Sequence, residues 1–183
     1  MPRGLKIRYY TGFGGHMHKH KVTAKQNNSR MCLVCGLENK LGLLSRFYET
    51  ENKEVVGIVT GREEHQGYPG RMHGGIVSAI LDETIGRAVT IEDPDAWGVT
   101  AELSVRFKKP VPLDEELRVV GRIKKSGGKI FSGTGELILK DGTVAATAEG
   151  KYVRLKIDSI VEDKDEFHKE WFLFPENDDP ERI

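Results

Sequence analysis

Hydrophobic and polar residues alternate along the second half of the chain. In segment 100–109, TAELSVRFKK, every second residue is apolar, which predicts a strand with one buried face. Segments 116–125, 129–140 and 143–156 also have the composition of long strands, separated by SGG and Asp-Gly turns. These residues predict an antiparallel meander of four strands.

The first half predicts a hairpin followed by a helix. Segments 42–51 and 53–61 are two strands joined at Asn52, and a loop rich in glycine follows them. The helix is expected from about residue 74 to 91, before EDPDAW. Because it is apolar on nearly all sides, it must be covered by a curved sheet, which predicts an α+β fold.

The length of the chain favours one domain with terminal extensions. We expect a loosely ordered basic arm at 1–30, the domain at 31–157 and an acidic tail with a short helix at 158–183. The opposite charges of the two ends allow them to pair with each other.

Composition narrows the possible partners. Lys plus Arg (28) balances Asp plus Glu (28), so we expect no nucleic-acid partner. No run of 18 apolar residues and no secretory signal are present, which predicts a cytoplasmic protein without a membrane span.

The unusual residue of the helix is Asp82. At about 100° per residue, it shares one side of the helix with Gly75, Ser78 and Gly86, and these small residues leave a groove beside it. Asp82 is either a satisfied structural carboxylate or a general base or nucleophile facing a ligand. Glu83 has an ordinary surface explanation, because Arg87 follows four residues later.

The helix begins at a glycine pair, Gly74 and Gly75. Free N–H groups at a helix N-terminus can stabilise developing negative charge, although the pair could also serve only a tight turn. Together with Asp82, such donors could bracket one reacting carbonyl.

Three segments carry a family resemblance: HQGYPGRMHGGIVSAILDETIGRAV, VTAELSVRFKKPVPLDEELRVVGRI and DGTVAATAEGKYV. They resemble the hotdog-fold acyl-CoA thioesterases, in the branch that includes the phenylacetate-pathway enzymes. The resemblance implies a hotdog fold and hydrolysis of an acyl-CoA substrate without a metal or organic cofactor. It also implies a homodimer or homotetramer with its site at a subunit interface.

The resemblance also implies roles for single residues. Asp82 matches the acid that activates water or attacks the thioester, and the Gly74 N–H matches the oxyanion donor. His73 matches the motif histidine, and Thr100 matches a hydroxyl residue that helps to hold the water.

One position departs from the family pattern. Several relatives have an asparagine six residues before the motif histidine, and this chain has Gly67 there. His65 or Gln66 could polarise the thioester instead.

The two cysteines, Cys32 and Cys35, have the spacing of zinc ligands, and His16, His18 and His20 precede them. A zinc site, a redox pair and a plain turn with two thiols are the alternatives.

Two other functions compete with hydrolysis. A hydratase or dehydratase of the same fold would need a histidine beside Asp82, and the helix has none. An acyl-CoA sensor without turnover would leave Asp82 unexplained.

Overall fold

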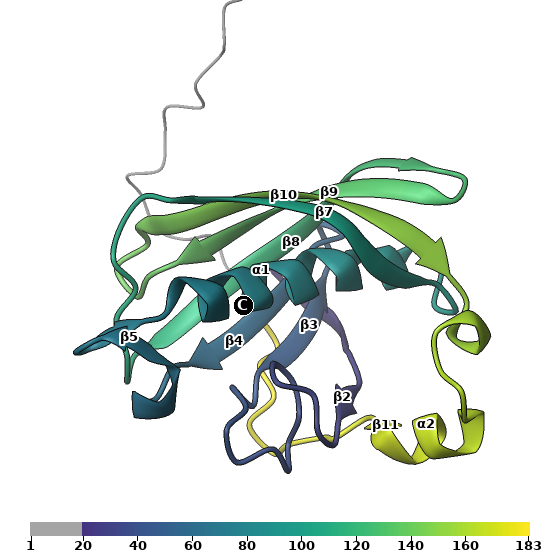
Figure 1. The fold of residues 1–183 in the computed structure, drawn as a ribbon, viewed down its shortest axis with the longest axis horizontal. Coiled ribbons are helices and arrows are strands. Elements are labelled where there is room, and N and C mark those ends of the chain that lie inside the picture. Colours follow the sequence, from purple (N-terminus) through teal and green to yellow (C-terminus); the bar gives the residue numbers. More distant parts are fainter. Residues whose placement is uncertain (1–19) are drawn as a thin grey trace, which may run out of the picture.

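The computed structural model describes residues 20–183 (Figure 1). The main sheet contains, in chain order, β1 (Val22–Lys25), β3 (Arg46–Thr50), β4 (Val55–Thr60), β7 (Trp97–Phe107), β8 (Glu116–Gly127), β9 (Ile130–Ile138) and β10 (Val144–Leu155). Two short strand pairs join β5 (Gln66–Tyr68) to β6 (Arg71–Met72) and β2 (Asn28–Ser29) to β11 (Trp171–Phe172). The helices are α1 (Gly74–Arg87) and α2 (Lys164–Glu170), with short 3₁₀ turns at Glu63–His65, Ala88–Ile91 and Ile157–Ser159.

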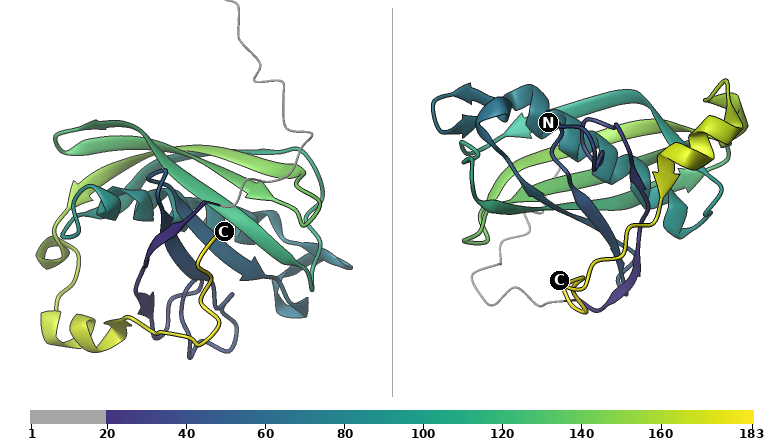
Figure 2. Two further views of the ribbon diagram at one scale, coloured as in Figure 1. Left: turned by 180° about the vertical axis from the view of Figure 1, so that it is seen from behind. Right: turned by 90° about the horizontal axis from the view of Figure 1, so that it is seen from below.

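The sheet curves around α1, as Figures 1 and 2 show from three sides. Its strand order is β1-β3-β4-β8-β9-β10-β7, with antiparallel neighbours throughout. The predicted hairpin and curved α+β arrangement are therefore present. The predicted four-strand meander is wrong in one respect: β7 pairs with β10 and not with β8. The meander therefore contains only β8, β9 and β10, and strand β4 of the hairpin pairs with β8.

The helix packs directly on the sheet because glycines line its path. A Cβ at Gly121 would lie 2.4 Å from the carbonyl oxygen of Thr84, and one at Gly133 would lie 2.5 Å from the Ile85 side chain. Ile80, Leu81 and Ile85 of α1 are fully buried in the resulting core. The helix ends at Arg87, and the last residues of the predicted helix form the tighter 3₁₀ turn.

We expect Gly121→Ala to destabilise the protein. The new methyl group would meet helix backbone, which cannot move aside as a flexible side chain can. Overpacking of this kind costs about 1–3 kcal/mol. Urea unfolding should show this loss, whereas Gly127→Ala, at a site with open space around the Cβ position, should change stability by less than about 0.5 kcal/mol. Equal stabilities of the two variants would contradict the close contact.

The two ends of the described chain do pair with each other. His20 and Ile183 exchange two backbone hydrogen bonds of 2.7 and 2.9 Å, and Lys25 forms ion pairs with Glu176 and Asp179. The expectation of a loose arm is therefore wrong for its last part, where β1 joins the sheet beside β3. Residues 1–19 of the predicted arm, which include His16 and His18, lie outside the described residues.

The acidic tail contains the predicted short helix, α2. Phe167 and Trp171 of the tail form edge contacts with Trp97 of β7, with ring centroids 5.2 and 4.8 Å apart. These contacts pack α2 and β11 against the first residue of β7. None of the described helices is long and apolar enough to cross a membrane.

Candidate active site

Asp82 lies two turns along α1 and is half-buried. The Thr100 hydroxyl lies 2.9 and 3.0 Å from its two carboxylate oxygens, and the Tyr152 hydroxyl donates to Oδ1 over 3.0 Å. Tyr152 also lies 3.2 Å from the Asp82 carbonyl oxygen. These contacts fix the carboxylate without enclosing it.

Asp82 also lines a groove of about 680 Å³. Its lining also includes Trp97 and Thr100 of β7 and Phe167 and Trp171 of the tail. A carboxylate that is both positioned by hydroxyl groups and open to a cavity can reach a bound molecule. This geometry favours the functional interpretation of Asp82 over the structural one.

Tyr152 is a site residue that the sequence interpretation missed. Burial, followed by the charge and hydrogen bond of Asp82, raises the pKa of its phenol above the usual value. The phenol therefore remains protonated and acts as a donor. Its burial, though not its contact with Asp82, could have been predicted from the alternation in β10, where Ala146, Ala148 and Tyr152 are all buried.

We expect Tyr152→Phe to destabilise the protein. The substitution keeps the ring stacked on Phe131, with centroids 5.0 Å apart, and removes only the hydroxyl. A hydrogen bond to a charged group contributes about 1.5–3 kcal/mol. Urea denaturation should report a loss in this range, and unchanged stability would show that water replaces the phenol at Asp82.

The N-terminus of α1 presents unpaired N–H donors, among them that of Gly74. His73 is the N-cap, and its Nδ1 accepts the Gly75 N–H over 2.9 Å. Among the described residues, none accepts a hydrogen bond from the Gly74 N–H. The ring of Phe107 packs beside Gly74, 3.4 Å from where a Cβ would lie.

The Gly74 N–H and the Asp82 carboxylate are far apart within one chain. Eight residues of helix separate Gly74 from Asp82, which corresponds to about 12 Å at 1.5 Å per residue. Helix geometry therefore argues against the expectation that the two groups of one chain bracket a single carbonyl. A reacting group can contact both only if they come from two copies of the chain.

His65 and Gln66, the two residues that could replace the absent asparagine, lie in different environments in the structure. His65 is buried, with Nδ1 accepting the Arg62 N–H and Nε2 lying 2.9 Å from the Leu41 carbonyl oxygen. Both its nitrogens are thus used within the protein, which argues against its predicted role. Gln66 is exposed on β5, and Gly67 lies against His73 with little room for a side chain.

Glu83 and Arg87 form the predicted ion pair, but not on the surface. Arg87 is 7% exposed, its Nε and Nη2 both contact Glu83 Oε1, and its guanidinium packs on the Phe47 and Trp171 rings. The surface interpretation of this pair is therefore wrong, because β3 and the tail cover it.

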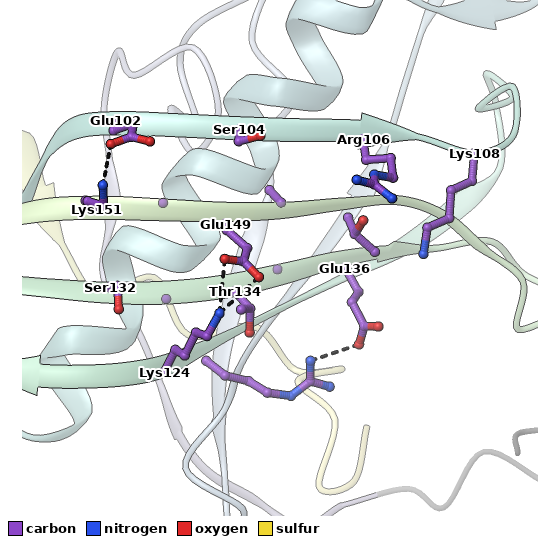
Figure 3. Close-up of a pocket in the computed structure, with 16 residues that line it drawn as sticks. Glu102, Ser104, Arg106, Lys108, Lys124, Ser132, Thr134, Glu136, Glu149 and Lys151 are labelled. Carbon is purple, nitrogen blue, oxygen red and sulfur yellow. Dashed lines mark hydrogen bonds and ion pairs between the residues drawn. The ribbon is translucent and has the colours of Figure 1, made fainter. Parts of the chain in front are cut away.

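A second hollow, of about 760 Å³, lies on the outer face of the sheet (Figure 3). Its charged groups largely pair with one another, as in Lys124–Glu149, Lys151–Glu102 and Arg122–Glu136. It contains none of the predicted catalytic residues. We therefore place the candidate active site in the groove at Asp82, although the outer hollow is larger.

The central helix and the strands that follow it match a known family model. Residues 69–146, which contain α1, β7, β8 and β9, match the model of the thioesterase superfamily. The central part of this chain is therefore similar to the thioesterase superfamily. Its curved sheet around one helix is the hotdog fold, as predicted.

Individual relatives resemble this part of the chain. Acyl-coenzyme A thioesterase THEM4 of Rattus norvegicus is 31% identical over 124 residues, covering 67% of this chain and 53% of the rat protein. A thioesterase-superfamily protein of known crystal structure is 33% identical with a TM-score of 0.63, covering 68% of this chain and 60% of its own. A hypothetical thioesterase of Streptococcus pneumoniae, solved with coenzyme A, shares the fold at 21% identity and a TM-score of 0.52, over 56% of this chain and 82% of its own. The chain spans about half the length of the mammalian THEM4 proteins that it matches.

Proposed function

We propose that this protein hydrolyses acyl-CoA thioesters. The observation that carries the proposal is the Asp82 carboxylate, which Thr100 and Tyr152 hold at the wall of a groove in a domain similar to the thioesterase superfamily. The activity in the name of the rat relative and the coenzyme A bound to the streptococcal protein support the substrate class.

In this mechanism Asp82 accepts a proton from water as the water oxygen attacks the thioester carbonyl. The C–S bond then breaks, the acyl group leaves as a carboxylic acid, and the thiolate of coenzyme A takes up a proton. Thr100 orients the water beside the carboxylate. Direct attack by Asp82, followed by hydrolysis of the anhydride, is the other route open to the same carboxylate.

The oxyanion donor in this proposal is the Gly74 N–H of a second copy. The dipole of α1 and the unpaired N–H favour negative charge at that point. Gln66, on the strand next to the motif loop, is the candidate polariser of the thioester carbonyl. The proposed assembly is therefore a homodimer or a dimer of dimers.

Strand β7 offers the surface for this assembly. It is an edge strand of 11 residues, paired on one side with β10. Val99 and Phe107 are 38% and 53% exposed on it. Long unpaired edges are usually covered in native proteins, and pairing of two β7 strands would bring two copies of α1 side by side.

Release of free thiol from a panel of acyl-CoA esters tests the function. We expect hydrolysis of at least one ester, with saturation kinetics. Tight binding of acyl-CoA without thiol release would replace the proposal with the sensor, and hydration of an enoyl-CoA without thiol release would replace it with the hydratase.

A further inference from the structure

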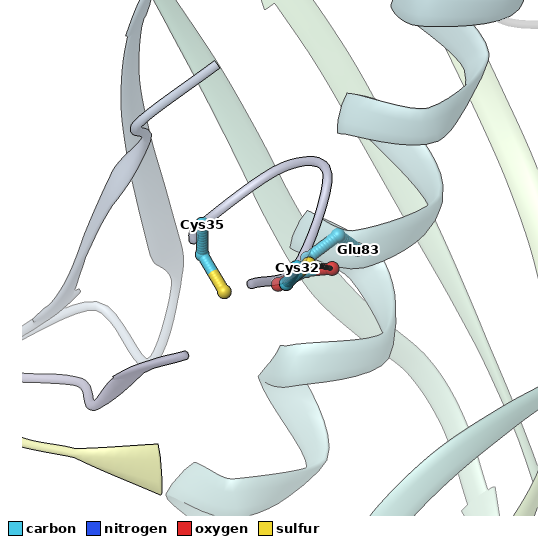
Figure 4. Close-up of side chains that lie close together, drawn as sticks. All are labelled: Cys32, Cys35 and Glu83. Carbon is cyan, nitrogen blue, oxygen red and sulfur yellow. Dashed lines mark hydrogen bonds between the residues drawn. The ribbon is translucent and has the colours of Figure 1, made fainter. Parts of the chain in front are cut away.

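A cluster of metal-binding side chains lies beside the proposed catalytic helix and has no part in the proposed reaction. It consists of Cys32 and Cys35, from the loop before β3, and Glu83 of α1 (Figure 4). The two sulfur atoms and a carboxylate oxygen all lie within 4.8 Å of one another, and Cys32 Sγ is 3.5 Å from Glu83 Oε2. We call these three residues the thiol–carboxylate cluster.

The loop holds both sulfur atoms in a fixed turn. The Val34 N–H donates to Cys32 Sγ over 3.3 Å, and the Gly36 N–H donates to the Cys32 carbonyl over 2.9 Å. A Cβ at Gly36 would lie 2.3 Å from that carbonyl oxygen, so the turn requires glycine directly after Cys35. A backbone N–H aimed at sulfur stabilises a thiolate, which is the form that binds metals.

A buried amide anchors this loop to the rest of the protein. Asn28, 1% exposed, donates to the carbonyl oxygens of Cys35 and Ser45 over 2.8 and 2.9 Å. Since the turn is built by these contacts, the sulfur atoms are pre-positioned for a ligand.

The third donor, Glu83, is oriented by Arg87. Arg87 contacts Glu83 Oε1 through two nitrogens, at 3.0 and 2.9 Å, which leaves Oε2 directed at Cys32. Hydrogen bonds of this kind, from a group that does not itself bind the metal, fix the orientation of metal ligands.

The charges of the cluster match a divalent cation. Two thiolates and one carboxylate, offset by the Arg87 guanidinium, leave a net charge of about −2 in a mostly buried site. The negative charge of Glu83 beside the two sulfur atoms favours a bound cation. Thiolate ligands select a soft or borderline ion, for which zinc is the common choice.

We propose that Cys32, Cys35 and Glu83 bind one zinc ion. Three protein donors leave one coordination position, and because Cys32 and Glu83 line the groove, a water molecule can supply it. The ion would join the loop before β3 to α1 at the residue next to Asp82, and so tie the N-terminal loop to the catalytic helix.

Cobalt titration of the reduced, chelator-treated full chain tests the proposal. The chain contains two cysteines, so thiolate-to-cobalt charge-transfer absorption reports on this cluster alone. We expect one cobalt ion per chain, displaced by zinc. Cys32→Ser should abolish the charge-transfer band, and Glu83→Gln should weaken zinc binding by about 10–100-fold. Glu92→Gln, at an exposed carboxylate, is the matched control and should bind as the wild type does.

Three results would overturn the proposal. The first is the absence of a charge-transfer band in reduced protein whose near-ultraviolet circular dichroism shows it to be folded. The second is a disulfide between the cysteines that forms equally fast with and without excess zinc. The third is loss of binding when His16, His18 and His20 are replaced by alanine while Glu83→Gln has no effect. All these readouts are independent of thioester hydrolysis, so they hold whether or not the proposed function does.

Discussion

Asp82→Asn should remove most of the hydrolytic activity while leaving the fold intact. The asparagine oxygen can still accept the hydrogen bonds from Thr100 and Tyr152, so the side chain keeps its place. It cannot take a proton from water, and a positioned base contributes about 10²–10⁴-fold in rate. We therefore expect kcat to fall by about that factor, with a smaller change in KM, when thiol release is followed with the best substrate of the panel.

The control for this variant is Glu92→Gln, which removes one negative charge from the exposed surface ten residues away. It should retain wild-type kcat. Near wild-type turnover by Asp82→Asn would exclude the carboxylate from the chemistry and restore the structural interpretation of its hydrogen bonds. Thr100→Ala provides an intermediate case, because it leaves the base in place and removes one group that positions it.

The sequence was sufficient to predict the fold because its signals are local. Alternating residues in 100–109 and the Asp-Gly turn at 141–142 indicate strands and a hairpin from neighbouring residues alone. The position of β7 at the edge depends on which strand covers α1. The glycines that lie against the helix, such as Gly121 and Gly133, are distant from it in sequence.

The candidate site likewise contains residues that local sequence predicts and residues that only distant contacts bring together. Asp82 and the Gly74 N–H could be found from the sequence because one helix carries both of them. Tyr152 could not be assigned to Asp82, since 70 residues separate them and only the curvature of β10 brings its hydroxyl to the helix. The burial of Arg87 could not be predicted either, because Trp171, which covers it, comes from the distant C-terminal tail.

A second large loss of activity is expected from Gly74→Pro. Proline lacks the N–H and is well tolerated at the first position of a helix. His73 already has φ −66° and ψ 139°, which is the conformation that a residue before proline requires. The variant should therefore fold and lose only the oxyanion donor, which lowers kcat by about 10²–10³-fold. Gly74→Ala keeps the donor, and its methyl group makes an ordinary contact with Phe107, so it should remain active.

Mixing the two inactive variants then locates the donor. Suppose that each site combines Asp82 of one chain with Gly74 of the other. A mixed dimer of Asp82→Asn and Gly74→Pro chains then has one intact site and one doubly altered site. Random reassociation of equal amounts makes half of the dimers mixed, so about a quarter of the wild-type activity should return. A site within one chain predicts no recovery at any ratio. The 12 Å between the two groups along α1 makes recovery the expected result, because no single copy of the helix can place both on the same carbonyl.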